Sequence, residues 1–156
     1  MKKWLFYVLV FAGIPVLSFG GFGGEDVGKL SPVQVIAVLG EEEQVQLLTD
    51  TGELGMGKDV RQAISNMEER APARVFLDTA DYLLLKPCAE IWLPELLEHL
   101  RPSCHLCYLT AESDLEEAGK YLQIHEPDLT LSQYEAGERE LPYLISDEGR
   151  LKLVQP

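Results

Sequence analysis

Basic residues are scarce in this chain: 13 lysines and arginines stand against 26 aspartates and glutamates among 156 residues, for a formal net charge of −13. An acidic surface repels nucleic-acid backbones and anionic lipid headgroups. Nucleic acid is therefore not an expected partner. The acidic residues are spread along the chain and apolar periodicity continues almost to Pro156, so we expect a folded acidic domain.

Cysteine is also scarce, with three in the chain, at Cys88, Cys104 and Cys107. The last two form a C-x-x-C pair, but redox motifs of this kind open a helix after a strand. "CHLCYLT" has the composition of a strand, on which the two sulfurs point apart. A disulfide from Cys88 to one of the other two and three buried thiols are both open interpretations.

Recognisable metal-site spacing is lacking as well. Cys88, His99, Cys104, His105 and Cys107 are the candidate zinc ligands, yet their spacing matches no standard zinc motif. The metalloprotease helix motif is absent too. We expect no metal and no cofactor. A thiol-redox or metal-binding protein that uses Cys104 and Cys107 is the alternative functional class.

One glycine-rich segment, "TGELGMGKDV" (51–60), nearly matches the phosphate-binding motif G-x-x-x-x-G-K-[ST]. The position after Lys58 requires a hydroxyl group that ligates magnesium, and Asp59 stands there instead. Glu53 adds a second carboxylate to the loop, and both oppose the charge of a phosphate. We therefore interpret the glycines as a turn from strand to helix and expect no bound nucleotide.

The chain begins with a positively charged "MKK", an uncharged apolar run (4–19) and the small residues of "SFGGFGG". This order is typical of a signal peptide, with cleavage after Gly20 or Gly23. The uncharged stretch is also about 20 residues long, enough for an uncleaved membrane anchor. Residues 1–23 are thus predicted to be a signal peptide or an anchor. Residues 24–156 are predicted to form a single domain that is exported, either secreted or membrane-anchored.

Hydrophobic periodicity predicts several strands. "PVQVIAVLG" (32–40) is apolar on both faces and "QVQLLTD" (44–50) alternates, so the two are predicted to form a hairpin inside a covered sheet. "ARVFLDTADYLLLKP" (73–87) is predicted to be one strand, parallel to an earlier strand. Further strands are predicted at "CHLCYLT" (104–110) and in a C-terminal hairpin, "LPYLI" and "RLKLV" around "SDEG".

Helical spacing of apolar residues predicts helices over 58–70, 89–101 and 114–122, the second broken or restarted by Pro94. Ser113 and Glu116 are expected to form a capping box at the start of the third helix, and a short helix is expected from Thr130. The predicted fold class is α/β (α+β), a mixed sheet of about four to six strands with roughly three helices packed on it and a C-terminal hairpin. The predicted helical core residues are Val60, Ile64, Met67, Leu97, Leu100, Leu115 and Leu122.

Asp78 and Asp81 are the most tempting catalytic pair, because both interrupt an apolar strand. Residues three apart on a strand point to opposite faces, so the pair shares a site only if "DTAD" bends. We interpret this segment as a bulge or turn whose carboxylates satisfy backbone amides. No catalytic residue is therefore assigned, and the chain is not expected to be an enzyme.

The order of these features resembles the first domain of the Ger(x)C lipoproteins, the C subunits of spore germination receptors. The similarity is carried by the export signal, the early strand pair, "GMGKDVRQAISNM", "RVFLDTADYLLLKPCAE", "LPELLEHLRPSCHLCYLTAE", "DLEEAGKYL" and "TLSQYEAGERELPYLI". It covers nearly all of the chain after the export signal. Two features differ: no lipobox cysteine follows the apolar run, and the family continues into further domains beyond the position of Pro156.

The resemblance implies a free-standing relative of one domain that assembles with other proteins. We therefore expect a non-enzymatic, exported protein-interaction or assembly module at the cell envelope or spore membrane, related to sporulation or germination. Its contact with the membrane would be through the N-terminal segment if this is uncleaved. In the family the late region, here 123–156, leads to a neighbouring domain. Tyr134, Leu141 and Tyr143 are therefore expected to form an exposed apolar contact surface.

Overall fold

The computed structural model describes residues 30–40, 43–110, 114–138 and 140–156. The interpretation of residues 1–23 as a signal peptide or anchor lies outside these ranges. Within them, no helix is long and apolar enough to cross a bilayer.

A seven-stranded mixed sheet organises the described residues, in the order β4-β3-β2-β6-β7-β8-β9. β2, β6, β7 and β8 run parallel to one another, whereas β3, β4 and β9 are antiparallel to their neighbours. The predicted fold class is confirmed, with more strands than expected. The strands are β2 (Val35–Val38), β3 (Val45–Thr49), β4 (Leu54–Gly57), β6 (Tyr82–Leu85), β7 (His105–Leu109), β8 (Tyr143–Asp147) and β9 (Arg150–Val154).

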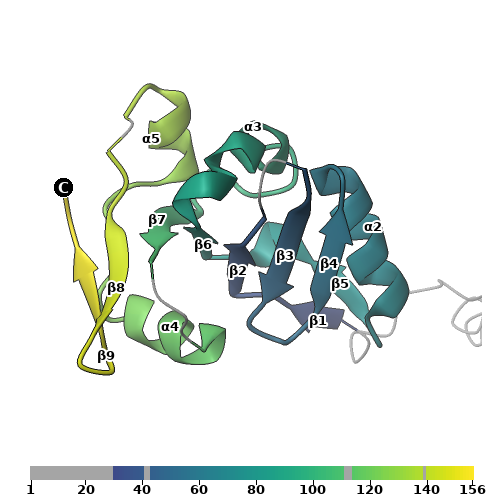
Figure 1. Cartoon of the computed structure of the whole chain (residues 1–156), viewed down its shortest axis with the longest axis horizontal. Helices are drawn as coiled ribbons and strands as arrows, with labels where there is room; N and C mark the ends of the chain where they lie inside the picture. Colours follow the sequence, from purple (N-terminus) through teal and green to yellow (C-terminus); the bar gives the residue numbers. More distant parts are fainter. Residues whose placement is uncertain (1–29, 41–42, 111–113, 139) are drawn as a thin grey trace, which may run out of the picture.

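Four α-helices pack on this sheet in the described ranges. Figure 1 shows α2 beside β4 at one end of the sheet and the β8–β9 hairpin at the other end. The helices are α2 (Val60–Arg70), α3 (Leu93–Leu96), α4 (Leu115–Leu122) and α5 (Leu131–Glu135), and a 3₁₀ turn, η3 (Pro87–Trp92), leads into α3.

Two hydrophobic clusters lie on opposite faces of the sheet, because alternate residues of β2 and β6 belong to different clusters. Ile36 and Leu83 join the cluster that also holds residues of α2, η3, α3 and α5. Val35 and Leu84 join the cluster on the face that α4 covers. All four residues of β2 are buried. This explains why its sequence is apolar on both faces.

Two predicted hairpins are confirmed. β2 pairs antiparallel with β3, and β8 pairs antiparallel with β9. The second turn is made by Glu148 (φ 49°) and Gly149 (φ 76°). Two consecutive residues with positive φ match the right-handed twist of the paired strands.

The prediction of one continuous strand over 73–87 is wrong. The structure divides it into β5 (Arg74–Phe76), a 3₁₀ turn η2 (Leu77–Thr79) and β6. β5 pairs with β1 (Leu30–Pro32) in a separate parallel sheet of two strands. The Thr79 hydroxyl holds the bend, since it accepts from the Val33 amide (3.1 Å) and donates to the Phe76 carbonyl (2.7 Å). The expected parallel pairing of the second half, β6, with β2 is confirmed.

The helix predicted over 89–101 is also shorter than expected. Only α3, four residues long, is α-helical, and Pro94 lies in its first turn. Proline has no amide N–H and is tolerated at a helix start but not inside a helix, so the chain restarts there as predicted.

The helix starts depend on side-chain caps. Asp114 caps α4 by accepting from the Glu116 amide at 3.0 Å; Ser113, the predicted cap, lies outside the described residues. α5 begins at Thr130 with a capping box that includes Gln133, so the expected short helix is confirmed.

The predicted helical core is largely correct. Ile64 and Leu97 are half-buried and pack against the first cluster. The other five predicted residues are buried: Val60, Met67, Leu100, Leu115 and Leu122.

Candidate functional site

The interpretation of the glycines of the phosphate-motif-like segment as a turn is wrong for Gly55 and Gly57, which lie in a strand and allow its close contact with a helix. Gly55 and Gly57 lie in β4. A Cβ atom on Gly55 would come within 2.2 Å of the Ala63 carbonyl oxygen, and one on Gly57 within 2.5 Å of the Ala63 amide nitrogen. Glycine is therefore needed because α2 lies directly against this strand.

Backbone amides at the start of α2 already donate hydrogen bonds to carboxylates. Asp59 Oδ1 accepts from the Gln62 amide at 2.7 Å, and Glu95 Oε2 accepts from the Val60 amide at 3.1 Å. A phosphate at a helix start would need these same donors. Asp59 is the N-cap of α2, so the helix predicted over 58–70 begins at Val60.

The three cysteines are free thiols, and the structure does not bring them together. Cys88 is exposed on η3, and its thiol donates to the Gly40 carbonyl (3.6 Å). Cys104 belongs to the first cluster and Cys107 to the second, so the two sulfurs lie on opposite faces of the sheet. Burial raises the pKa of each of these two thiols to about 12. A thiol that stays protonated is a poor nucleophile and a poor metal ligand.

The candidate metal ligands are not brought together either. In the described ranges, no three His, Cys, Asp or Glu side chains are grouped in a way that could hold a metal ion. His105 is engaged otherwise: Nδ1 lies 2.6 Å from the Pro127 carbonyl oxygen and Nε2 lies 3.2 Å from Glu126 Oε1. It ties the start of β7 to the segment after α4.

The two aspartates of "DTAD" do not share a site. Asp81 forms an ion pair with Arg101, whose Nε also donates to the Ala80 carbonyl at 3.0 Å. Asp78 is exposed in η2. The bend that the sequence allowed does form, and Asp81 joins the start of β6 to the segment before β7.

Tyr134, Leu141 and Tyr143 were expected to be exposed. This prediction is wrong for two of the three residues. Tyr134 is 8% exposed and Leu141 is 2% exposed, and both belong to the first cluster. They are buried because α5 and the segment before β8 fold back onto η3, α3 and β7. Tyr143 alone is exposed, at 42%.

A glutamate on η3 joins two tyrosines that are distant in sequence. Glu90 Oε2 accepts from the Tyr108 hydroxyl at 2.6 Å, and Oε1 accepts from the Tyr134 hydroxyl at 3.1 Å. Burial, and then the hydrogen bond to Glu90, raise the pKa of Tyr108 well above its ordinary value. Tyr108 is thus a fixed hydrogen-bond donor that fastens β7 to η3. Sequence reasoning missed this contact because no spacing relates Glu90 to either tyrosine.

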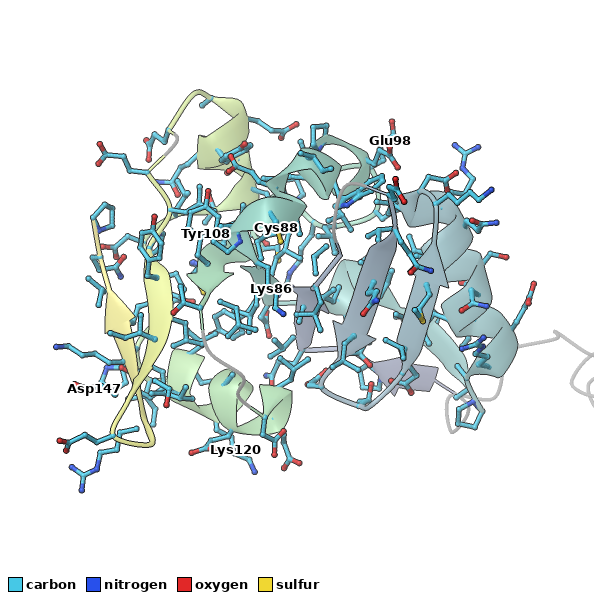
Figure 2. The ribbon with its side chains drawn as sticks, viewed as in Figure 1. Lys86, Cys88, Glu98, Tyr108, Lys120 and Asp147 are labelled. Atoms are coloured by element: carbon cyan, nitrogen blue, oxygen red, sulfur yellow. The ribbon has the colours of Figure 1, made fainter. Side chains whose placement is uncertain are left out.

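An exposed apolar pair lies beside Tyr108, where β8 and β9 pair with each other. Tyr143 and Val154 are direct register partners, 42% and 39% exposed. The Tyr143 ring lies 5.1 Å from the Tyr108 ring, centroid to centroid. Figure 2 shows Asp147 near the turn of this hairpin and Tyr108 beside its opposite end. We call Tyr143 and Val154, with Tyr108 at their side, the Tyr143 patch.

The other exposed large apolar side chains of the described residues are far apart in the chain: Leu54 in β4, Ile91 in η3 and Ile124 in the turn after α4. Apolar residues scattered singly on a surface are ordinary, whereas contiguous exposed apolar area is typical of contact surfaces. The Tyr143 patch is therefore the better candidate. The alternation of "LPYLI" and "RLKLV" around a two-residue turn was the signal that could have paired Tyr143 with Val154.

The edge strands of the sheet carry side-chain caps on outward-facing amides. On β4, the Met56 amide donates to Asn66 Oδ1 of α2 at 3.2 Å. On β9, the Leu153 amide donates to the Tyr121 hydroxyl of α4 at 3.0 Å. Such caps hinder the addition of a strand from another protein. The geometry therefore favours binding through the side chains of a sheet face over binding along an edge.

A cavity of about 430 Å³ lies between α5 and the end of β9. Pro142 and Gln155, the chain neighbours of Tyr143 and Val154, are among the residues that line it. Its described lining residues are Asp128, Leu129, Gln133, Glu138, Glu140, Pro142, Gln155 and Pro156. Three of these described residues, Asp128, Glu138 and Glu140, are carboxylates.

Comparisons with protein-family models, with curated proteins and with solved structures find no match. The part of the chain that the structure describes is a mixed α+β fold with an exposed apolar pair on β8 and β9 and a cavity that carries three carboxylates. The relation to the germination-receptor C subunits stays a hypothesis that rests on the sequence resemblance.

Proposed function

We propose that this chain is an exported, non-enzymatic domain that binds another protein of the cell envelope or spore membrane through the Tyr143 patch. The observation that carries the proposal is the adjacent exposure of Tyr143 and Val154 on one sheet face. Aromatic and aliphatic side chains that meet on a surface gain free energy when a partner removes them from water.

Two further arguments support this class of function. The buried thiols, with pKa values of about 12, are unsuited to redox catalysis at neutral pH. The ion pair of Asp81 with Arg101 and the hydrogen bonds of Glu90 to two tyrosines join elements of the fold. Export is supported by the charged and then apolar start of the sequence, and a role in sporulation or germination by the resemblance to the Ger(x)C family.

Site-specific photo-crosslinking in the native cells tests the proposal. A benzoylphenylalanine in place of Tyr143 is expected to give one discrete adduct. The same group in place of Ser65, an exposed residue of α2, is expected to give none. Because the partner is outside the cytoplasm, protease added to protoplasts should digest the adduct.

A second substitution separates binding from chance proximity. Val154→Asp places a charge in the centre of the patch and should abolish the adduct. Ile124→Asp, at a position that is 79% exposed in the turn after α4, should leave it unchanged. Absence of an adduct at Tyr143, or an adduct that survives Val154→Asp, contradicts the proposal.

A further inference from the structure

We infer that the partner places an aspartate or glutamate side chain against Lys152 while apolar residues beside that carboxylate cover Tyr143 and Val154. This inference rests on the proposed function and specifies the chemistry of the partner. It joins two observations on one face of the β8–β9 hairpin: the exposed apolar pair, and a neighbouring lysine whose register partner carries no charge.

The register of the hairpin places Lys152 on the same face as the apolar pair. Tyr143 is paired with Val154, and Ile145 is paired with Lys152. Residues two apart on a strand point to the same face, and paired residues lie side by side, with Cβ atoms about 4.5–5.5 Å apart. These four side chains therefore form one continuous surface. A partner that covers Tyr143 and Val154 also meets Lys152, which is exposed.

The fold leaves this part of the sheet face open. Leu144 and Leu153 alternate with the exposed residues and belong to the cluster under α4, so Tyr143 and Val154 point away from α4. On their own face, Tyr143 is the register partner of Tyr108, which η3 covers through the hydrogen bond to Glu90. The covered part of this face thus ends at β7, and the hairpin extends beyond it.

Charge selects the chemistry of the partner. Arg150, the other cation of β9, has Asp147 as its register partner, whereas Lys152 has the apolar Ile145. Among the described residues, no hydrogen bond or ion pair engages the Lys152 ammonium group. A partner that covers this charge without an opposite charge of its own removes its hydration at a cost in free energy. A carboxylate offsets that cost and fixes the position of the partner.

The charge of the whole chain limits how acidic the partner is. With a net charge of −13, the chain repels strongly acidic proteins and anionic lipid surfaces. This repulsion is screened beyond about 8 Å at physiological ionic strength, whereas a carboxylate in contact with Lys152 is within that distance. The expected segment of the partner therefore combines aromatic or aliphatic residues with a single aspartate or glutamate.

Crosslinking in the native cells with variants of Lys152 is the first test. With benzoylphenylalanine in place of Tyr143, Lys152→Arg should keep the adduct because it keeps the charge. Lys152→Glu should lower its yield about tenfold, because two negative charges would meet. Lys58→Glu, at an exposed lysine before α2, makes the same change in net charge at the opposite end of the sheet (Figure 1) and should leave the yield unchanged. Circular dichroism of the purified variants reports whether they remain folded.

A charge exchange identifies the carboxylate. Random peptides on phage are selected on the full-length chain, purified in mild detergent, and the binders that Val154→Asp abolishes are synthesised. We expect these peptides to carry one aspartate or glutamate among apolar residues. Their affinity for Lys152→Glu should be about tenfold weaker than for the wild-type chain. A peptide in which lysine replaces that carboxylate should bind Lys152→Glu more tightly than it binds the wild-type chain.

The outcomes separate this inference from the proposed function. An adduct that survives Lys152→Glu, an equal loss in Lys58→Glu, peptides without a carboxylate, or no peptide that depends on Val154 overturn the inference. A lysine that only keeps the edge strand β9 from pairing with another strand gives the first of these results. Binding to vesicles of anionic lipid that Lys152→Glu abolishes assigns the surface to a membrane and overturns it too. Absence of the Tyr143 adduct with Lys152 intact contradicts the proposed function itself.

Discussion

At the scale of single residues, burial decides the chemistry of the side chains that first attract attention. Cys104 and Cys107 lie in separate apolar clusters, and burial favours their neutral form. Tyr108 is held neutral by burial and by Glu90. The reactive forms of these groups, thiolate and phenolate, are therefore those that the fold disfavours.

The two buried thiols are expected to make stability depend on alkaline pH. Their folded pKa of about 12 exceeds the unfolded value of about 8.5. Their contribution to stability is therefore complete below pH 8.5 and falls as pH rises towards 12. Urea unfolding should show a loss of about 2–3 kcal/mol between pH 7.5 and 9.5 from both thiols together.

The control for the thiol prediction is Cys104→Ala/Cys107→Ala. This variant should be less stable at pH 7.5 but should lose less of its remaining stability at pH 9.5. An identical loss in the wild-type chain and in this variant would assign the pH dependence to other groups.

At the scale of elements, contacts between neighbouring strands and helices explain the departures from the predicted boundaries. Local periodicity correctly located α2, α4 and α5. It failed at 73–87 because Thr79 bonds to Val33, which is remote in sequence. It failed at 89–101 because the chain packs as a 3₁₀ turn, with Glu90 directed to Tyr108.

Gly55→Ala is expected to destabilise the contact between β4 and α2. The new Cβ would meet the Ala63 carbonyl oxygen at 2.2 Å and Met67 Cβ at 2.9 Å, so the helix must move. Gly55 does not have a positive φ, so the effect is steric. Overpacking of this kind costs about 1–3 kcal/mol, which urea unfolding would measure.

Ser65→Ala on the exposed face of α2 serves as its control and should change stability by less than about 0.5 kcal/mol. A Gly55→Ala protein as stable as the wild-type chain would show that α2 can shift freely on β4, contrary to the close contact described.

At the scale of the whole molecule, the central strands couple the two faces of the sheet. β2 and β6 contribute alternate side chains to both clusters. A cavity created in one cluster should therefore lower the stability of the other cluster as well. The described residues should unfold in one transition.

Leu122→Ala, in the cluster under α4, is expected to cost about 2–5 kcal/mol, because Leu122 is fully buried. In a Trp4→Phe background, fluorescence of Trp92 reports the opposite face. Its unfolding midpoint should fall together with the midpoint from circular dichroism. Ile124→Ala, at an exposed position, should leave both midpoints unchanged, and separate midpoints in Leu122→Ala would refute a single cooperative unit.

The sequence by itself determined the fold class, the two hairpins, three of the helices and most of the helical core. It could do so because alternation, helical spacing, caps and turn residues act between neighbours in the chain. Gly149 and the capping residue Thr130 were visible in this way. The exposure of Tyr143 was expected as well, but from the resemblance and not from such a pattern.

Only the tertiary structure decided the rest of the candidate site. Tyr134 and Leu141 were expected to be exposed because the resembled family continues into another domain there, yet α5 folds onto η3 and β7 and buries them. Val154 joins Tyr143 through the β8–β9 register, and Asp128 reaches Glu138 and Glu140 around a shared cavity. These relations depend on which elements pack together. That packing is set by burial summed over the whole chain, so no local pattern of residues carries it.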